Sequence, residues 1–183
     1  MNLINTSIKD LIVIQPKIFK DKRGYFYESF NLKTFKKNFG NINFVQDNES
    51  KSTKGVLRGF HFQKPPFDQA KLVRCLKGKV LDVALDLRKN SPTYGNFEKV
   101  ILSEANKKQL FIPRGFAHAF LVLSKSAIFS YKVDNFYAPK YESGVIWNDP
   151  DLSIDWTLDQ SKLIVSEKDK NLCILKNLKS PFI

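Results

Sequence analysis

The sequence predicts an all-β protein whose strands form an antiparallel sandwich or barrel. Short runs rich in Val, Ile, Phe and Tyr recur along the chain, and Gly, Pro, Asn and Asp separate them, as is typical of strands and turns. No helical pattern alternates with these runs, which argues against a parallel α/β sheet. The 183 residues are 43% hydrophobic and 26% charged, the balance of a soluble globular protein. We therefore expect one domain over residues 1–183, with a less regular tail from about residue 150.

In chain order, the first predicted strand covers residues 25–30, and the one predicted helix follows it over residues 31–39. Asn31 is a typical N-cap, and the apolar side chains at positions 32, 35 and 39 fall on one stripe. In the clearest strand, over residues 79–87, the odd-numbered residues face one side and the even-numbered residues the other. The remaining predicted strands cover residues 44–46, 56–62, 72–76, 97–102, 110–112, 117–123 and 127–133.

The net charge of +12 favours an anionic partner, which leaves nucleic acid, an acidic membrane or a phosphorylated small molecule. The basic residues are scattered without a block of five or six, so we expect no nucleic-acid partner. No apolar run approaches the length of a membrane span, and the run at 11–14 is too short for a signal peptide. Cys75 and Cys173 lie in apolar settings and are expected to be buried free thiols. We therefore expect a cytoplasmic protein without a membrane partner.

Two spacings resemble the motifs of the cupin superfamily, whose fold is a double-sheet β-barrel, or jelly roll. The first is Gly55-Val-Leu-Arg58-Gly-Phe-His61-Phe-Gln63, and the second is Pro113-Arg-Gly115-Phe-Ala-His118. The first cupin motif normally ends in His-x-His, which supplies two metal ligands, whereas this chain has Gln63 at the second position. With His61 and His118 as its only histidines, the chain cannot form a site of two or three histidines at these motifs. We expect a cupin-type barrel with short peripheral helices and a metal-free pocket.

His61 is open to two interpretations, a hydrogen-bonded core imidazole or a functional group. The polar side chains predicted near it are too many for a plain core: Arg58, Gln63, Gln69 and Lys71. A basic neighbour also keeps an imidazole neutral at pH 7, the form that a general base requires. In a regular strand Arg58 and His61 face opposite sides, so a shared pocket requires a bulge or kink at Gly59.

Three further motifs are ambiguous when taken alone. The segment 21–24 is typical of a solvated turn at a strand boundary. The segment 46–48 is typical of a loop, although its amide groups suit the edge of a nucleobase. Tyr131 alternates with apolar residues on a predicted strand, which is typical of a core residue.

In their order along the chain, these motifs resemble the dTDP-4-dehydrorhamnose 3,5-epimerase family, the metal-free cupins of deoxysugar biosynthesis. The resemblance extends from about residue 19 to residue 169, and each motif is weak while the ordered set is specific. The departures are small: Phe60 replaces a usual Leu, Ala119 a usual Gly, and Trp156-Thr157 a common Trp-Pro. The motifs are Phe-x-Asp-x-Arg23-Gly-x-Phe-x-Glu28, Gln46-Asp-Asn48, Gly55-Val-Leu-Arg58-Gly-x-His61-Phe-Gln, Gln69-x-Lys71-Leu-Val-Arg, Ser91-Pro-Thr-x-Gly95, Ile112-Pro-x-Gly-Phe-Ala-His118, Tyr131-Lys, Glu142-x-Gly and Trp147-Asn-Asp-Pro150.

This resemblance implies a role for each matching residue. His61 corresponds to the general base and Tyr131 to the general acid. Asp169 corresponds to the carboxylate that orients the histidine, and Lys71 lies near the keto oxygen of the sugar. The residues that correspond to nucleotide-sugar contacts are Arg23, Glu28, Gln46, Asp47, Asn48, Arg58, His118, Glu142 and Lys168.

The implied reaction converts dTDP-4-dehydro-6-deoxy-D-glucose to dTDP-4-dehydro-L-rhamnose, for deoxysugar and polysaccharide biosynthesis. The 4-keto group acidifies the C3 and C5 hydrogens, so a base can form an enolate whose charge Lys71 stabilises. An acid on the other face of the ring then inverts the carbon. No redox change occurs and no glycine-rich dinucleotide motif is present, so no cofactor is expected. The resemblance also implies a homodimer.

Two alternatives stay open from the sequence. The first is an epimerase that inverts only one carbon of a related nucleotide sugar. The second belongs to another class, a catalytically silent cupin that binds an anionic ligand. The joint presence of His61, Lys71, Tyr131 and Asp169 disfavours the silent cupin.

Overall fold

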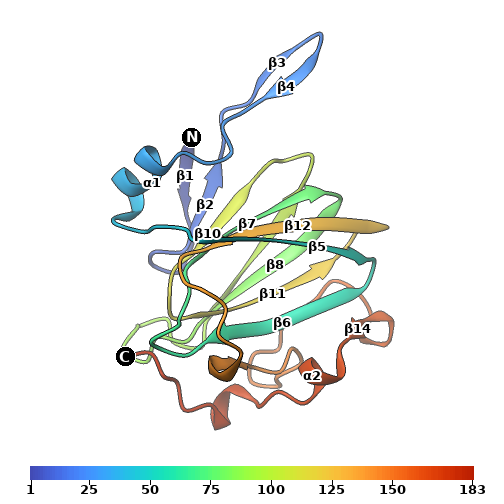
Figure 1. Ribbon diagram of the computed structural model, residues 1–183. Coiled ribbons are helices and arrows are strands. Elements are labelled where there is room, and N and C mark those ends of the chain that lie inside the picture. The colour runs from blue at the N-terminus through green and yellow to red at the C-terminus, as the bar shows by residue number, and fades with distance from the viewer.

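Two six-stranded sheets face each other in the computed structural model, which describes residues 1–183 (Figure 1). The first sheet has the order β1-β2-β10-β7-β12-β5, and the second has β13-β6-β11-β8-β9 with β14 beside β6. All pairs in the two sheets are antiparallel except β14 with β6, so the predicted cupin-like, all-β fold is confirmed. The strands are β1 Asn2–Asn5, β2 Ile12–Gln15, β3 Phe19–Asp21, β4 Gly24–Phe26, β5 Gln46–Thr53, β6 Val56–Gln63, β7 Lys71–Lys77, β8 Lys79–Asp86, β9 Phe97–Ser103, β10 Gln109–Ile112, β11 Phe116–Val122, β12 Ser126–Val133, β13 Glu142–Gly144 and β14 Ile164–Val165.

The helices are short and lie at the periphery. Helix α1 covers Leu32–Phe39 and α2 covers Glu167–Lys170, and three 3-10 turns cover Pro139–Tyr141, Gln160–Lys162 and Leu175–Asn177. Asn31 caps α1 as predicted, because its side-chain oxygen accepts a hydrogen bond from the amide of Thr34. The predicted apolar stripe is wrong at its first position, since Leu32 is exposed while Phe35 and Phe39 pack against Phe111.

Strand β8 explains how the second sheet is covered on both faces. The even-numbered Val80 and Ala84 join the core between the sheets, and the odd-numbered Leu81 to Leu87 join a second core on the outer face. That outer core is closed by apolar residues of the C-terminal segment, Leu152, Ile154 and Trp156 among them. The segment beyond residue 150 therefore packs across the second sheet, and this packing brings α2 against β6 (Figure 1).

The seven predicted strands that correspond to β6 through β12 match the structure to within one residue at each end. The strand predicted over 25–30 is wrong, because β4 ends at Phe26. The strand predicted over 44–46 is misplaced, since β5 begins at Gln46 and runs to Thr53. Strand β5 is polar along its whole length, so it has none of the apolar alternation that marks a strand buried against a core.

The hairpin of β3 and β4 projects away from the body of the barrel (Figure 1). Its aromatic side chains Phe19, Tyr25 and Phe26 are all exposed. Of the two cysteines, Cys75 is buried as predicted, but the prediction for Cys173 is wrong because it is exposed. None of the helices has the length and apolar character needed to cross a membrane.

Candidate active site

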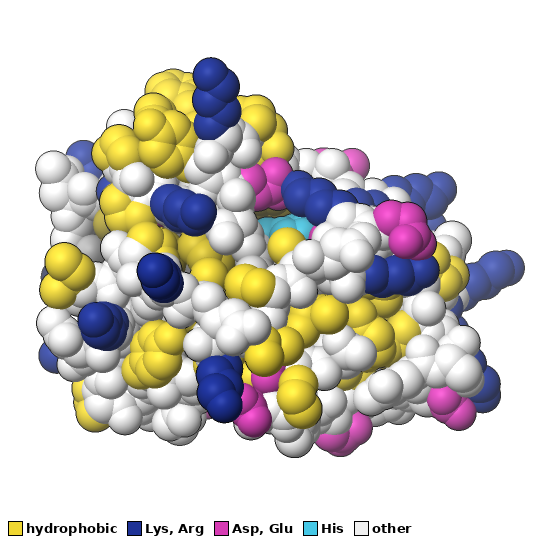
Figure 2. Space-filling view, turned by 90° about the horizontal axis from the view of Figure 1, so that it is seen from below, with side chains coloured by type: hydrophobic (Ala, Val, Ile, Leu, Met, Phe, Trp, Pro, Cys, Tyr) yellow, Lys and Arg dark blue, Asp and Glu magenta, His cyan; other side chains and the backbone are white.

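A cavity of about 300 Å³ opens between the two sheets, where β5, β6, β7, β11 and β12 converge. Figure 2 shows histidine atoms at the bottom of a hollow, with basic and acidic side chains beside it. The following residues predicted to act on a substrate line this cavity: Asn48, Arg58, His61, Lys71, His118, Tyr131 and Glu142. The fold thus gathers residues that lie up to 94 positions apart in the chain.

Asp169 binds the ring of His61, as the resemblance implied. The Nε2 of His61 lies 2.6 Å from Oδ1 of Asp169, and the other carboxylate oxygen accepts the amide of Gly59 at 3.2 Å. Burial favours a higher pKa for Asp169, but the hydrogen bonds from His61 and Gly59 outweigh it and hold the pKa below its usual value. Because a carboxylate only accepts, the hydrogen of this bond lies on Nε2 of His61.

The predicted irregularity at Gly59 is confirmed as a β-bulge. His61 pairs with His118 and Arg58 with Phe120, so two residues of β6 stand opposite one residue of β11. Gly59 has a φ of +115°, and a Cβ atom there would lie 2.5 Å from the carbonyl oxygen of His118. Only glycine fits this position, and the bulge turns Arg58 and His61 into the same cavity.

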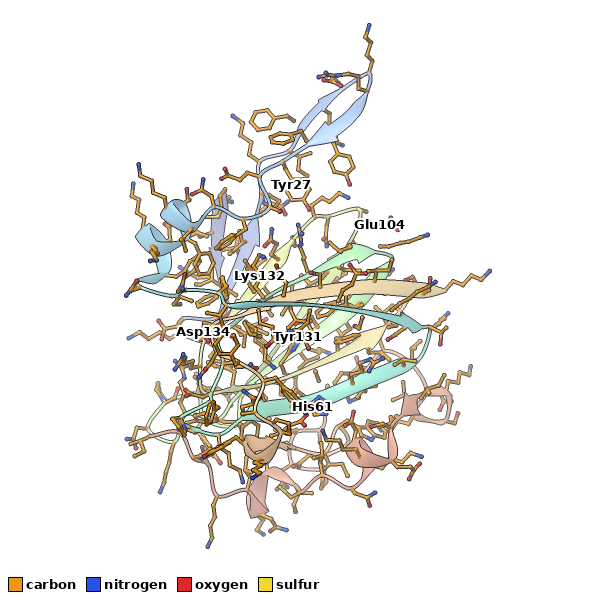
Figure 3. All side chains as sticks on the ribbon, viewed as in Figure 1. Tyr27, His61, Glu104, Tyr131, Lys132 and Asp134 are labelled. Carbon is orange, nitrogen blue, oxygen red and sulfur yellow. The ribbon has the colours of Figure 1, made fainter.

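Lys71 on β7 and Tyr131 on β12 belong to the first sheet, whereas His61 belongs to the second. Figure 3 shows Tyr131 and His61 on their separate strands. Burial lowers the pKa of Lys71 to about 8, although the negative charges of Asp82 and Glu142 partly oppose this. Burial also raises the pKa of Tyr131, so its phenol keeps its hydrogen at neutral pH. The cavity therefore places a proton acceptor on one wall and a proton donor on the other.

A second imidazole–carboxylate pair borders the cavity. His118 was predicted to contact the substrate, but its partner Asp82 was not singled out from the sequence. Nε2 of His118 is 2.9 Å from Oδ2 of Asp82, and Asp82 is fully buried. The other oxygen, Oδ1, has no hydrogen-bond partner. The sequence could have indicated Asp82, because it lies between Val80 and Ala84 on the face of β8 that points into the barrel. A buried carboxylate needs a hydrogen-bonding or charged partner, and His118 supplies one here.

The rim of the cavity carries an ionic cluster. Nζ of Lys168 lies 2.6 Å from Oε2 of Glu142, and the hydroxyl of Tyr137 donates to the same oxygen at 2.9 Å. Burial favours a higher pKa for Glu142, but the bonds from Lys168 and Tyr137 outweigh it and lower the pKa. Tyr137 was not singled out from the sequence. The feature that could have indicated it is the adjacent aromatic pair Phe136 and Tyr137, which does not fit the alternating pattern of a strand.

The segment 46–48 lies on strand β5 and not in the expected loop. Asn48 lines the cavity, and the side chain of Gln46 donates to it at 2.9 Å. Asp47 faces the other side of the sheet, where its carboxylate pairs with Lys132. Of the three predicted substrate contacts at 46–48, only Asn48 lines the cavity of its own chain.

Arg23 and Glu28 do not reach the cavity of their own chain. Arg23 lies on the projecting hairpin, where its side chain is 84% exposed and pairs with Asp21. Glu28 lies near the base of the hairpin beside a separate apolar depression, and it accepts a hydrogen bond from Asn31. Across the structure, no group of three His, Cys, Asp or Glu side chains is arranged to hold a metal ion.

We predict that Gly59→Ala lowers the free energy of unfolding by at least about 2 kcal/mol, because the added Cβ meets a backbone oxygen as well as an unfavourable φ. Gly24→Ala is the matched control. Gly24 has a similar φ of +128° with nothing within 4 Å, so it carries the backbone cost without the clash. Urea unfolding of both variants measures the difference, and equal losses would contradict the steric argument.

We further predict that the ammonium group of Lys71 titrates near pH 8 in the folded protein, whereas exposed lysines titrate near 10.4. Asp82→Asn removes a negative charge that raises this pKa, so the Lys71 midpoint falls further. NMR titration of protein labelled at the lysine side chains measures both values, with Lys71→Met to assign the signal. An unchanged midpoint in Asp82→Asn would show that Asp82 does not act on Lys71.

Comparison with known proteins places this geometry in a family. The chain matches the family model for dTDP-4-dehydrorhamnose 3,5-epimerase over residues 5–177. It is 52% identical to the dTDP-4-dehydrorhamnose 3,5-epimerase of Shigella flexneri over 172 residues, which cover 93% of this chain and 94% of the relative. The crystal structure of the enzyme of that name from Elizabethkingia anophelis has a TM-score of 0.94 at 53% identity and covers 98% of both chains.

A second solved structure carries a bound sugar nucleotide. It is a dTDP-6-deoxy-D-glucose-3,5-epimerase from Legionella pneumophila in complex with dTDP-4-keto-L-rhamnose. Its TM-score is 0.93 at 48% identity, and the match covers 97% of this chain and 94% of that one. The protein therefore belongs to the dTDP-4-dehydrorhamnose 3,5-epimerase family.

Proposed function

We propose that the protein inverts C3 and C5 of dTDP-4-dehydro-6-deoxy-D-glucose to give dTDP-4-dehydro-L-rhamnose. The observation that carries the proposal is the His61–Asp169 pair on one wall of a cavity whose other wall holds Tyr131 and Lys71. Family membership and the nucleotide sugar bound by the Legionella pneumophila relative support the same substrate.

His61 acts as the general base. Its Nε2 is held by Asp169, so Nδ1 takes the proton from C3 or C5, and the carboxylate stabilises the imidazolium that forms. The electrons of the broken C–H bond move into the ring and onto the 4-keto oxygen. The ammonium of Lys71 stabilises that oxygen, and it is charged below a pH of about 8.

Tyr131 donates the new proton from its own hydroxyl group. Its phenol lies on the wall opposite His61, so the new C–H bond forms on the other face of the sugar and the carbon is inverted. The tyrosinate then regains a proton from solvent while His61 releases one, and the enzyme is ready for the second carbon. The reaction transfers protons only, so it needs no redox cofactor.

Cavity and rim offer contacts for the rest of the substrate. Arg58 donates only to the hydroxyl of Ser52 in its own chain, which leaves most of its guanidinium for the pyrophosphate. Asn48 offers an amide to the nucleotide, and the exposed ring of Tyr137 offers a flat face. Lys168 and Glu142 border the same opening.

The chain works as a homodimer in the cytoplasm. An isolated two-stranded hairpin is marginally stable, and Phe26 on the β3–β4 hairpin is 70% exposed, so the hairpin requires a surface to cover it. A second copy supplies that surface if each hairpin packs on the partner. Arg23 then reaches the partner's cavity, which reconciles its predicted substrate contact with its distance from its own cavity. The two unpaired cysteines suit a reducing compartment.

We predict that His61→Asn abolishes both product formation and hydrogen exchange at C3 and C5, because no enolate forms. Tyr131→Phe leaves the base intact, so inverted product falls steeply while deuterium enters the substrate with retained configuration. NMR of dTDP-4-dehydro-6-deoxy-D-glucose incubated with each variant in deuterated water measures both effects.

Wild-type protein in the same assay separates the alternatives. Deuterium at C3 and C5 with inversion at both supports the 3,5-epimerase, and inversion at one carbon identifies a single-carbon epimerase. No exchange at all is the result expected of a silent anion-binding cupin. Rapid inversion by His61→Asn would refute the assignment of the base.

Mixed dimers test whether Arg23 acts on the partner's cavity. Arg23→Ala alone is predicted to weaken dTDP binding roughly tenfold to a hundredfold, through loss of a charge-assisted contact. Random mixing of Arg23→Ala and His61→Asn chains places one intact site in each mixed dimer. With equal amounts of the two chains, about half of the dimers are mixed and one of the two sites in each is intact. Activity at low substrate concentration then recovers to about a quarter of the wild-type value. If Arg23 serves its own chain, mixing recovers nothing.

A further inference from the structure

Gln63 ends strand β6 beside the cavity, and its side chain joins two separate segments of the chain. Its Nε2 donates to the carbonyl oxygen of Phe67 at 2.6 Å and to that of Phe136 at 3.1 Å. Its Oε1 accepts the amide of Ala138 at 2.7 Å. The residue is 4% exposed. Both hydrogens of the amide and its oxygen are thus engaged by backbone groups, away from solvent.

The two bonds to Phe136 and Ala138 enclose Tyr137. Residues 134–138, called here the mouth segment, form neither helix nor strand. From Asn135 to Tyr137 this segment makes no backbone–backbone hydrogen bond, so side chains set its position. Gln63 is the only side chain that binds the backbone on both sides of Tyr137.

Two amide side chains from elsewhere in the chain bind the mouth segment at single points, and Asn135 within it donates to the carbonyl oxygen of Pro66 at 3.0 Å. Gln69 donates to the carbonyl oxygen of Asn135 at 2.8 Å, and Gln46 accepts the amide of Tyr137 at 3.3 Å. Both residues are less buried than Gln63. Gln63 therefore fixes the backbone on both sides of Tyr137, while Glu142 accepts the hydroxyl of the ring itself.

Tyr137 lines the cavity, and the residue is 54% exposed. We propose that Gln63 is a positioning residue, which holds the mouth segment so that Tyr137 meets the nucleotide end of the substrate. This inference rests on the proposed function, because it takes the ligand to be a dTDP-sugar. It assigns the Gln63 amide the task of holding a loop against the cavity, and proton transfer stays with other residues.

The chemistry of the contact distinguishes an amide from its close analogues. Gln63→Glu keeps the length and the acceptor for Ala138, but it sets a carboxylate oxygen against the carbonyl oxygens of Phe67 and Phe136. Gln63→Met keeps the approximate length and removes all three bonds. Gln15→Met is the control, since Gln15 donates to a single backbone carbonyl, that of Asn106, and does not line the cavity.

The test is calorimetric binding of dTDP together with steady-state kinetics. For Gln63→Glu and Gln63→Met, we expect the Kd for dTDP to rise at least about tenfold, while kcat at saturating substrate stays within about threefold of wild type. Gln15→Met is expected to bind dTDP as wild type does. A general loss of structure would lower kcat as well, so the split between the two constants separates positioning from folding.

A double-mutant cycle asks whether the effect passes through Tyr137. Once Tyr137→Ala has removed the ring, adding Gln63→Met is expected to weaken dTDP binding by less than about twofold. Unchanged dTDP binding in both Gln63 variants would overturn the proposal, and so would fully additive losses in the cycle. Failure of the wild-type protein to bind dTDP would instead refute the proposed function. If Gln63→Met does not fold, the dTDP binding and kinetics and the double-mutant cycle are measured with Gln63→Glu alone.

Discussion

Asp169 binds strand β6 through both of its carboxylate oxygens, one on the amide of Gly59 and the other on the ring of His61. Gly59 lies in the bulge that turns Arg58 into the cavity, and His61 follows that bulge. The carboxylate reaches them because α2 lies against β6, at the end of a segment whose apolar residues close the outer core. The packing of the C-terminal segment therefore places Asp169 where it holds both Gly59 and the ring of His61.

The charges around the cavity are paired unevenly, and this imbalance suits an anionic substrate. Three of the carboxylates near the cavity already have partners, Asp169 with His61, Asp82 with His118 and Glu142 with Lys168. Arg58 and Lys71 make no ion pair, since Arg58 donates to Ser52 and Lys71 to the carbonyl oxygen of His61. A substrate with a pyrophosphate and an oxygen that becomes negative supplies the missing partners.

Strands with a regular apolar pattern could be predicted from the sequence. Strands whose polar residues line the cavity could not. Strand β8 was predicted with its two faces because both pack on apolar cores. Strand β5 was not, because its inward residues, Asn48 and Ser50 among them, face a polar cavity. The contact between Asp169 and His61 followed from family resemblance alone, since no local pattern relates residues 108 positions apart. Arg23 could not be placed, because a hairpin that projects from its own barrel has no local signature.

The structure contains two imidazole–carboxylate pairs, and their surroundings decide which one can serve as the base. His61 and His118 pair directly across β6 and β11, so they stand on the same wall of the cavity. The side chain of His118 is 9% exposed and stacks on Phe129 with ring centroids 6.0 Å apart, whereas that of His61 is 31% exposed. A base must approach the hydrogen that it removes, and it must rotate little while doing so. His61 meets both requirements of the proposed base, because Asp169 fixes its ring and its side chain is the more exposed of the two. His118, enclosed by Asp82 and Phe129, is better suited to hold the substrate in place than to remove a proton from it.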